Sequence, residues 1–372
     1  MKNLRLLGFL MILASSSLLI NCTSDPIQGP PGADGSDGID GIDGVDSTTD
    51  CRTCHSNAYR EPIEAGYAIS THAIGGHVFG ETVTEGRNRY ACARCHSNEG
   101  FMDQIDYGST EEEGYKLVTP ISCTGCHFEH RSFNFEEDDN DFAIRTLEPV
   151  TLIVDSLITI DLTNESNALG QSNLCVNCHQ PRQAMPNDDG TDELYIAETD
   201  EYEIDNTHWG THHNPQSTML EGIQGVQFEG TKIYPDPRSS THRQESSCVN
   251  CHMRESSVAT TGDHTFNPRL DACIDCHGEL ENFNVDGFQT EVDAQLEVLA
   301  GLLAQVEGKN AAGETITGIV VDDDPVAGIF PFLGAQAAWN YIFVSEDQSR
   351  GVHNPEMVEA LLQNTIEALQ NQ

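Results

Sequence analysis

The chain has 372 residues, and its 60 acidic residues far outnumber its 18 lysines and arginines, which gives a formal net charge of −42 at pH 7. This balance excludes nucleic acid as an expected partner, because binding phosphates requires clustered basic side chains. The acidity either keeps the protein soluble where salt screens the repulsion or serves to dock a cationic partner.

Residues 1–21 have the pattern of an export signal. Lys2 and Arg5 supply its positive start, and the apolar run that follows is too short for a comfortable membrane span. The run ends at Cys22, as in bacterial lipoprotein signals, although Asn21 departs from the usual small residue. We therefore expect an exported outer-membrane lipoprotein that is anchored through a lipidated Cys22, on the periplasmic face or at the cell surface. Plain secretion with an incidental Cys22 is the alternative.

Residues 22–50 predict a lipidated stalk. Within this stretch, residues 29–46 form six Gly-x-y triplets, and glycine at every third position is typical of collagen. Only the first triplet contains prolines, so an extended acidic spacer and a short triple helix, which would make the protein a trimer, both stay open. An extended segment at about 3 Å per residue would span roughly 55 Å and hold the rest of the chain clear of a lipid surface.

Six copies of the motif Cys-x-x-Cys-His follow, and they use twelve of the 13 cysteines. This motif is the attachment signature of c-type haem: two thiols on one helical turn bond to the porphyrin, and the adjacent histidine reaches the iron from one side. Zinc sites and disulfides also use paired cysteines, but neither needs a histidine directly after every second cysteine. We therefore predict six covalently bound haem c groups. The predicted attachment residues are Cys51, Cys54, Cys92, Cys95, Cys123, Cys126, Cys175, Cys178, Cys248, Cys251, Cys273 and Cys276, and the predicted proximal ligands of the iron are His55, His96, His127, His179, His252 and His277.

The motifs begin 41, 31, 52, 73 and 25 residues apart. Short connections bring neighbouring porphyrins together, as electron tunnelling requires, because its rate falls steeply with distance. Hydrophobic residues make up only 38 % of the chain, so an ordinary core would be thin. We expect the porphyrins to complete the core, so that residues 51–277 form one hexahaem cytochrome domain that does not fold without haem.

The expected fold class is mainly α-helix and irregular coil, with the covalent haems as its core. Residues 149–162 are rich in valine, isoleucine and threonine, and they predict one or two strands as a small β insertion. Residues 180–240 contain many Asp, Gly, Pro and Asn residues and show little periodicity, which indicates loops with short helices.

Residues 278–372 predict a helical region that packs on the haems and supplies an axial histidine. A first helix would begin with Thr290 as its N-cap and stop near Gly308. A second helix is expected around residues 334–344, and a third after Asn354 as its N-cap. The expected apolar stripe of the first helix consists of Val292, Leu296, Leu299, Leu303 and Val306, and that of the third consists of Val358, Leu361, Leu362, Thr365 and Leu369.

Fifteen histidines leave nine outside the motifs, and six irons with two histidines each would need six of these nine. Methionine is scarce, so we expect mostly bis-histidine ligation. His130 lies three residues after His127, and both would leave one face of a continuing helix, so His130 would serve a neighbouring haem. The predicted distal ligands are His72, His130, His213, His242, His264 and His353, with His77, His208 and His212 in reserve.

Two segments resemble known families. The segment 242–268 (HRQESSCVNCHM…GDHTFNP) is similar to the paired-haem core of the pentahaem nitrite reductase and octahaem oxidoreductase superfamily. The segment 337–357 is similar to the C-terminal helices of that superfamily and of exported multihaem electron-transfer cytochromes. The resembled reductases have a lysine in place of one motif histidine, and this sequence does not, which lowers the expectation of the same catalysis. The resemblance implies axial roles for His72, His242, His264 and His353.

These features favour an electron carrier, because two axial histidines close both faces of each iron and leave no site for substrate. Its partners would be redox proteins or extracellular electron acceptors. The first alternative is an oxidoreductase with one open haem that acts on a small nitrogen or sulfur oxyanion, with charge supplied by Arg182, Arg238 or Arg243; pairing with carboxylates is the simpler role for these arginines. The second alternative is a conducting filament in which one histidine ligand comes from the next subunit.

Overall fold

The computed structural model describes residues 48–74, 89–111, 113–130 and 142–372. The predicted export signal, Cys22, all but the last three residues of the stalk, and His77 lie outside the described residues. The chain forms two units, Met1–Thr53 and Cys54–Gln372. Of the first unit, the structure describes the beginning of helix α2 (Thr48–His55).

Each of the six cysteine motifs forms a helical turn. In the third motif, the backbone N–H of His127 donates to Cys123 O at 2.8 Å, and the fourth and sixth motifs repeat this bond at 2.9 Å. The turn therefore places the two thiols, three residues apart, on one face. The helices that contain or overlap the motifs are α2, α5 (Tyr90–His96), α7 (Cys123–Cys126), α8 (Asn173–Val176), α11 (Cys248–His252) and α12 (Ile274–His277).

Short helices connect the motifs. Helix α6 (Asn98–Tyr107) begins where the Ser97 side chain accepts a hydrogen bond from the Gly100 N–H, and it ends at Gly108 with φ 76°. The other connecting helices are α3 (Asn57–Ala68), α4 (Thr71–Ile74), α9 (Gln216–Glu221) and α10 (Thr241–Glu245), and 3₁₀ turns occur at η2 (Asp263–Thr265), η3 (Leu270–Ala272) and η4 (Val285–Gly287).

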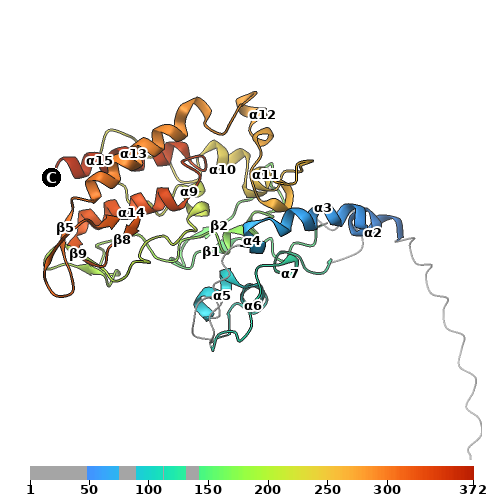
Figure 1. The fold of residues 1–372 in the computed structure, drawn as a ribbon, viewed down its shortest axis with the longest axis horizontal. Helices are drawn as coiled ribbons and strands as arrows, with labels where there is room; N and C mark the ends of the chain where they lie inside the picture. Colours follow the sequence, from blue (N-terminus) through green and yellow to red (C-terminus); the bar gives the residue numbers. More distant parts are fainter. Residues whose placement is uncertain (1–47, 75–88, 112, 131–141) are drawn as a thin grey trace, which may run out of the picture. The chain divides into compact units, whose positions relative to one another are not determined.

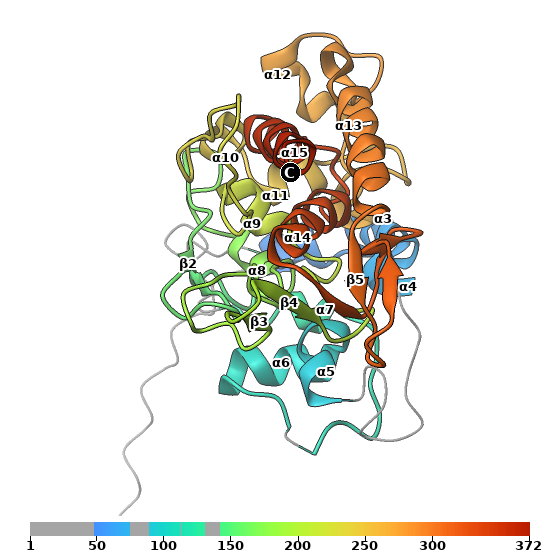
Figure 2. The same ribbon diagram turned by 90° about the vertical axis from the view of Figure 1, so that its left-hand side faces the viewer.

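Three long helices, α13 (Phe288–Leu303), α14 (Phe332–Glu346) and α15 (Pro355–Gln370), pack against one another at the C-terminal end of the chain (Figures 1 and 2). The predicted second and third helices are confirmed, and the Asn354 side chain caps α15 by accepting from Met357 N. The predicted cap at Thr290 is wrong. Helix α13 begins three residues earlier than predicted, at Phe288 after Gly287 with φ 83°, and the Thr290 hydroxyl accepts from the Asn284 amide instead.

The predicted β insertion is confirmed as the antiparallel pair β1 (Val150–Thr151) and β2 (Thr159–Ile160). A second sheet was not predicted. Its five antiparallel strands lie in the order β3 (Tyr195–Ile196), β4 (Glu201–Ile204), β9 (Gly328–Pro331), β5 (Glu307–Lys309) and β6 (Thr315–Thr317), and a further pair joins β7 (Val320–Val321) to β8 (Asp324–Pro325).

This sheet corrects two predictions. Residues 180–240 contain strands β3 and β4 beside the expected loops and the short helix α9. Gly308 lies within β5 rather than at the end of a helix, which comes at Leu303. A Cβ at Gly308 would lie 2.3 Å from the Phe330 ring, so the glycine allows the close packing of this ring onto β5.

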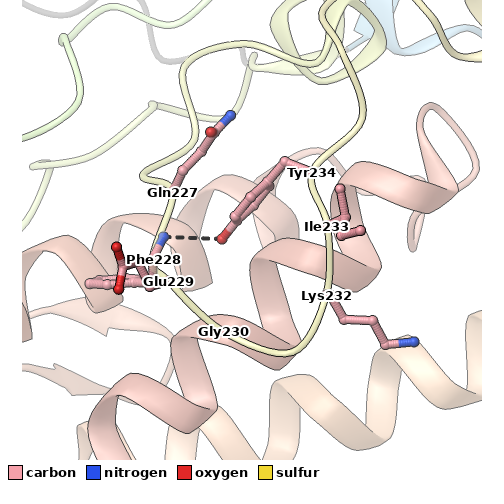
Figure 3. A pocket seen from close by; sticks show the side chains of 7 residues that line it. All are labelled: Gln227, Phe228, Glu229, Gly230, Lys232, Ile233 and Tyr234. Carbon is pink, nitrogen blue, oxygen red and sulfur yellow. Dashed lines mark hydrogen bonds between the residues drawn. The ribbon is translucent and has the colours of Figure 1, made fainter.

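The apolar side chains gather in two clusters. The larger cluster centres on α13, α14 and α15 and includes Trp339, Phe343 and Leu361 with no exposed surface. The smaller one packs Ile160 and Leu162 of the β insertion against Val176, which lies within the fourth motif. A surface hollow along residues 227–234, where Phe228 N donates to the Tyr234 hydroxyl, contains no motif residue and no histidine (Figure 3). Within the described ranges, no helix combines the length and apolarity that a membrane crossing would need.

Candidate haem-binding site

We number the motifs 1 to 6 in chain order: motif 1 (Cys51–His55), motif 2 (Cys92–His96), motif 3 (Cys123–His127), motif 4 (Cys175–His179), motif 5 (Cys248–His252) and motif 6 (Cys273–His277). All twelve cysteines are free thiols. Each motif therefore offers two thiols and a following histidine on one helical turn, which is what attachment of a haem requires.

Each motif histidine faces a second histidine from elsewhere in the chain. A metal ion held between two imidazole nitrogens at about 2 Å from each places the ring centroids roughly 6 Å apart. The six observed pairs have this spacing. They are His55–His130 at 6.2 Å, His179–His72 at 6.2 Å, His96–His212 at 6.0 Å, His127–His264 at 6.1 Å, His277–His242 at 6.1 Å and His252–His353 at 6.3 Å.

The structure brings five of the six predicted distal histidines opposite a motif histidine, and the sixth choice is corrected. His212, held in reserve by the sequence analysis, faces His96, whereas the predicted His213 does not. The His213 side chain is 66 % exposed, and its Nδ1 lies 2.7 Å from Glu346 Oε2. The sequence offered only adjacent histidines at this point, and a backbone with positive φ at both (60° and 33°) decides which ring points inward. Of the other two reserve histidines, His208 is exposed, and His77 lies outside the described residues.

The environment of His212 fits an iron ligand. Its Nε2 is buried and has no hydrogen-bond partner, which would be costly unless this atom binds a metal. Burial, followed by the positive charge of Arg182, lowers the pKa of His212 to about 4. Burial also lowers the pKa of His72 to about 4. Both rings are therefore neutral near pH 7, which is the form that binds metal.

The outer ring nitrogens of six axial candidates contact acceptor groups. An acceptor at Nδ1 keeps the proton on this atom and leaves Nε2 free for the iron. The acceptors are Phe142 O for His127 (2.7 Å), Phe266 O for His252 (2.8 Å), Val352 O for His242 (2.5 Å), Gln216 Oε1 for His179 (3.0 Å), Asp263 Oδ1 for His264 (2.6 Å) and Asp347 Oδ1 for His353 (2.7 Å).

Neighbouring motifs touch directly. Cys95 Sγ lies 3.9 Å from the Asn177 carbonyl, and Cys178 Sγ lies 3.9 Å from the Arg94 carbonyl, so motifs 2 and 4 are in contact. Motifs 4 and 5 meet where Ser172 Oγ donates to Ser247 Oγ at 2.9 Å. Groups attached at these motifs would therefore lie side by side.

The segment 263–266 connects three of the histidine pairs. His264 faces the histidine of motif 3, and the Phe266 carbonyl accepts from the histidine of motif 5. The Phe266 ring packs edge-on against His72, the partner of motif 4, with ring centroids 4.5 Å apart. The surroundings of motifs 3, 4 and 5 thus share one short piece of chain.

The three arginines singled out from the sequence differ in role. Arg238 Nε donates to Glu221 Oε2 at 2.6 Å, and Arg243 donates to the other oxygen of this fully buried carboxylate. These two arginines therefore neutralise a buried charge. Arg182 lies close enough to His212 to influence its pKa, which places a positive charge beside motif 2.

The family model for cytochrome c552 matches residues 82–372, which contain motifs 2 to 6. A solved structure titled outer cell wall cytochrome OcwA is 19 % identical, with a TM-score of 0.45; the match covers 82 % of this chain, and the chain spans about half of that protein (50 %). No curated protein matches the sequence significantly.

The match to the family model extends over most of the chain, and the motifs within it have the spacing that haem attachment requires. The protein therefore belongs to the cytochrome c552 family and is a multihaem c-type cytochrome.

Proposed function

We propose that the protein binds six haem c groups, each with two axial histidines, and that it relays single electrons through them at the cell envelope. The observation that carries the proposal is the set of six histidine pairs with ring centroids 6.0 to 6.3 Å apart. Two imidazoles close both faces of each iron, so the cofactor supplies electron transfer rather than substrate binding.

The contacts between motifs support a connected path. Haems 1 to 6 are named after their motifs. His130, the partner of His55, lies three residues after His127, which links haems 1 and 3. The segment 263–266 joins haems 3, 4 and 5, and the contact between motifs 2 and 4 adds haem 2 as a branch. The Val352 carbonyl, next to His353 of haem 5, accepts from His242 of haem 6. The relay therefore runs from haem 1 to haem 6 with a side branch at haem 4.

The envelope location rests on the sequence of the first 50 residues. An export signal that ends at Cys22 and an extended Gly-x-y spacer fit an outer-membrane lipoprotein that presents its haems away from the lipid surface. Redox proteins or extracellular acceptors would then be the electron partners, and the net charge of −42 favours partners with basic surfaces.

The ligation is tested with adjacent histidines as a matched pair. His212→Ala should convert one of six haems from low spin to high spin, because Nε2 of this residue faces His96, whereas His213→Ala should leave all haems low spin. Electron paramagnetic resonance of the oxidised proteins reports both spin states, and the intact mass gives the number of attached haems. High-spin iron in His213→Ala but not in His212→Ala would contradict the assignment.

One observation favours a second function at haem 2. His212 lies on backbone with φ 60°, a costly conformation for a residue other than glycine, and among the described residues its Nε2 has no hydrogen-bond partner, while Arg182 supplies a positive charge nearby. A small anion that displaces His212 would be attracted by the positive charge of Arg182. Addition of nitrite or hydroxylamine to the oxidised protein tests it: a change in the spectrum of one haem favours an enzyme, and unchanged low-spin spectra favour a pure carrier.

A further inference from the structure

The ring of His353 is held by a fully buried carboxylate. Asp347, just beyond the end of α14, has a side chain with no exposed surface, and its Oδ1 lies 2.7 Å from His353 Nδ1. The other oxygen, Oδ2, accepts from the Ser349 hydroxyl, which also accepts from the His353 backbone N–H at 3.2 Å. Asp347, Ser349 and His353 therefore form a closed hydrogen-bonded loop behind one axial ligand.

Five other axial histidines have a partner at the same ring atom that is neutral or more exposed to solvent. Four contact neutral groups: three backbone carbonyls and the Gln216 side-chain amide. His264 also contacts a carboxylate, that of Asp263, but this side chain is 35 % exposed, and water and salt screen its charge. The interior around Asp347 screens charge much less. Of these two carboxylates, Asp347 is thus the one whose charge is less screened.

A carboxylate behind an axial histidine changes the iron that the histidine binds. It draws the Nδ1 proton toward itself and makes the imidazole a stronger donor, and the partners around a ligand tune the potential of a metal in this way. A stronger donor and a nearby negative charge both stabilise ferric over ferrous iron. The reduction potential of the haem therefore falls.

We propose that Asp347 is a positioning residue that lowers the reduction potential of haem 5, the haem between His252 and His353, and that Ser349 limits this lowering by donating to the same carboxylate. The inference rests on the proposed bis-histidine ligation. Haem 5 lies between haems 4 and 6. Asp347 and Ser349 therefore set the reduction potential of a haem in the middle of the relay rather than at its end.

Asp347→Asn is the direct test. The asparagine oxygen still accepts from the ring, as the Gln216 oxygen does for His179, so the change removes charge and leaves the contact in place. At a fixed potential, we expect the reduced-to-oxidised ratio of one haem to rise at least tenfold, which corresponds to an upward shift of about 59 mV for each tenfold change. A spectroscopic redox titration that follows the individual low-spin signals measures the shift.

Two further variants separate tuning from structural damage. Ser349→Ala removes a donor from the carboxylate and should shift the same haem in the opposite direction, to a lower potential, which loosened packing would not explain. Asp263→Asn should shift haem 3 upward by less than Asp347→Asn shifts haem 5, because the Asp263 charge is already screened. If Asp347→Asn does not fold, the direction of the Ser349→Ala shift decides.

The possible failures can be told apart. Unchanged potentials in Asp347→Asn, or shifts of the same sign in Asp347→Asn and Ser349→Ala, would overturn the inference while the wild-type protein still shows six low-spin haems. Fewer haems or high-spin iron in the wild-type protein would instead overturn the proposed ligation itself.

Discussion

The helices after residue 287 and the region of the haem motifs are stabilised by different means. Helices α13, α14 and α15 share an ordinary hydrophobic core, and α14 alone buries eleven of its side chains or glycines, Trp339 and Phe343 among them. Among the motif cysteines, by contrast, each is exposed or half-buried. Apolar side chains hold the first region together, whereas the second is arranged around paired histidines whose spacing suits an iron between them.

Removing haem should produce the largest effect of all, and the two regions should differ in how much of their fold they keep. In a host that cannot attach haem, we expect residues 54–277 to lose their fold, because attached groups supply both packing and ligand bonds there. The helices α13 to α15 should keep part of their protection. Hydrogen exchange followed by mass spectrometry of the colourless protein measures this. Equal protection in both regions would contradict the comparison.

The second-largest effect is expected from shortening a side chain at the centre of the hydrophobic core of α13, α14 and α15. Trp339 is fully buried, donates to the Gln224 carbonyl at 2.8 Å and lies edge-on to Trp209. Trp339→Ala should destabilise the haem-loaded protein by about 3–5 kcal/mol, because it leaves a cavity and an unpaired carbonyl. Thermal unfolding monitored at the C-terminal helices reports the loss. Leu157→Ala, at a side chain 92 % exposed, is the control and should change the midpoint little.

A third test concerns the buried carboxylate Glu221, which connects α9 to the segment before motif 5 and so stabilises the region of the haem motifs by an ionic contact. It accepts from both Arg238 and Arg243. Glu221→Gln leaves two positive charges with a neutral partner and should cost about 3 kcal/mol. We expect the haem spectra to change as well, since Arg243 follows His242 directly. Unchanged spectra and an unchanged unfolding midpoint would show that the contact contributes nothing.

The smallest effect is expected at the cap of α15. Asn354→Ala removes the acceptor for Met357 N and should destabilise the protein by about 1 kcal/mol, and Asn354→Ser, which keeps an acceptor, should cost less. Thermal unfolding again measures both. Because Asn354 follows His353, a change in the haem 5 signal with either variant would show that this cap also positions the ligand; the account expects none with Asn354→Ser.

The sequence was most informative where haem attachment requires cysteines and a histidine at fixed spacing. The six cysteine motifs predicted the helical turns and the motif histidines, and five of the six histidines expected as distal ligands lie opposite a motif histidine in the structure. The sequence analysis chose His213 over its neighbour His212, because the sequence does not show the two positive backbone angles at this point. The strands β3 to β9 were missed because segments of two to four residues are too short to show alternation. Asp347 was missed because its burial comes from packing of distant segments.

The most direct test of the central claim is the axial ligand set of the oxidised, fully loaded protein. Near-infrared magnetic circular dichroism separates His/His from His/Met and high-spin haem, and the intact mass counts the haems in the same sample. The account predicts six haems with a His/His signature for each. A His/Met band, a high-spin fraction in the absence of added ligand, or fewer than six attached haems would contradict it.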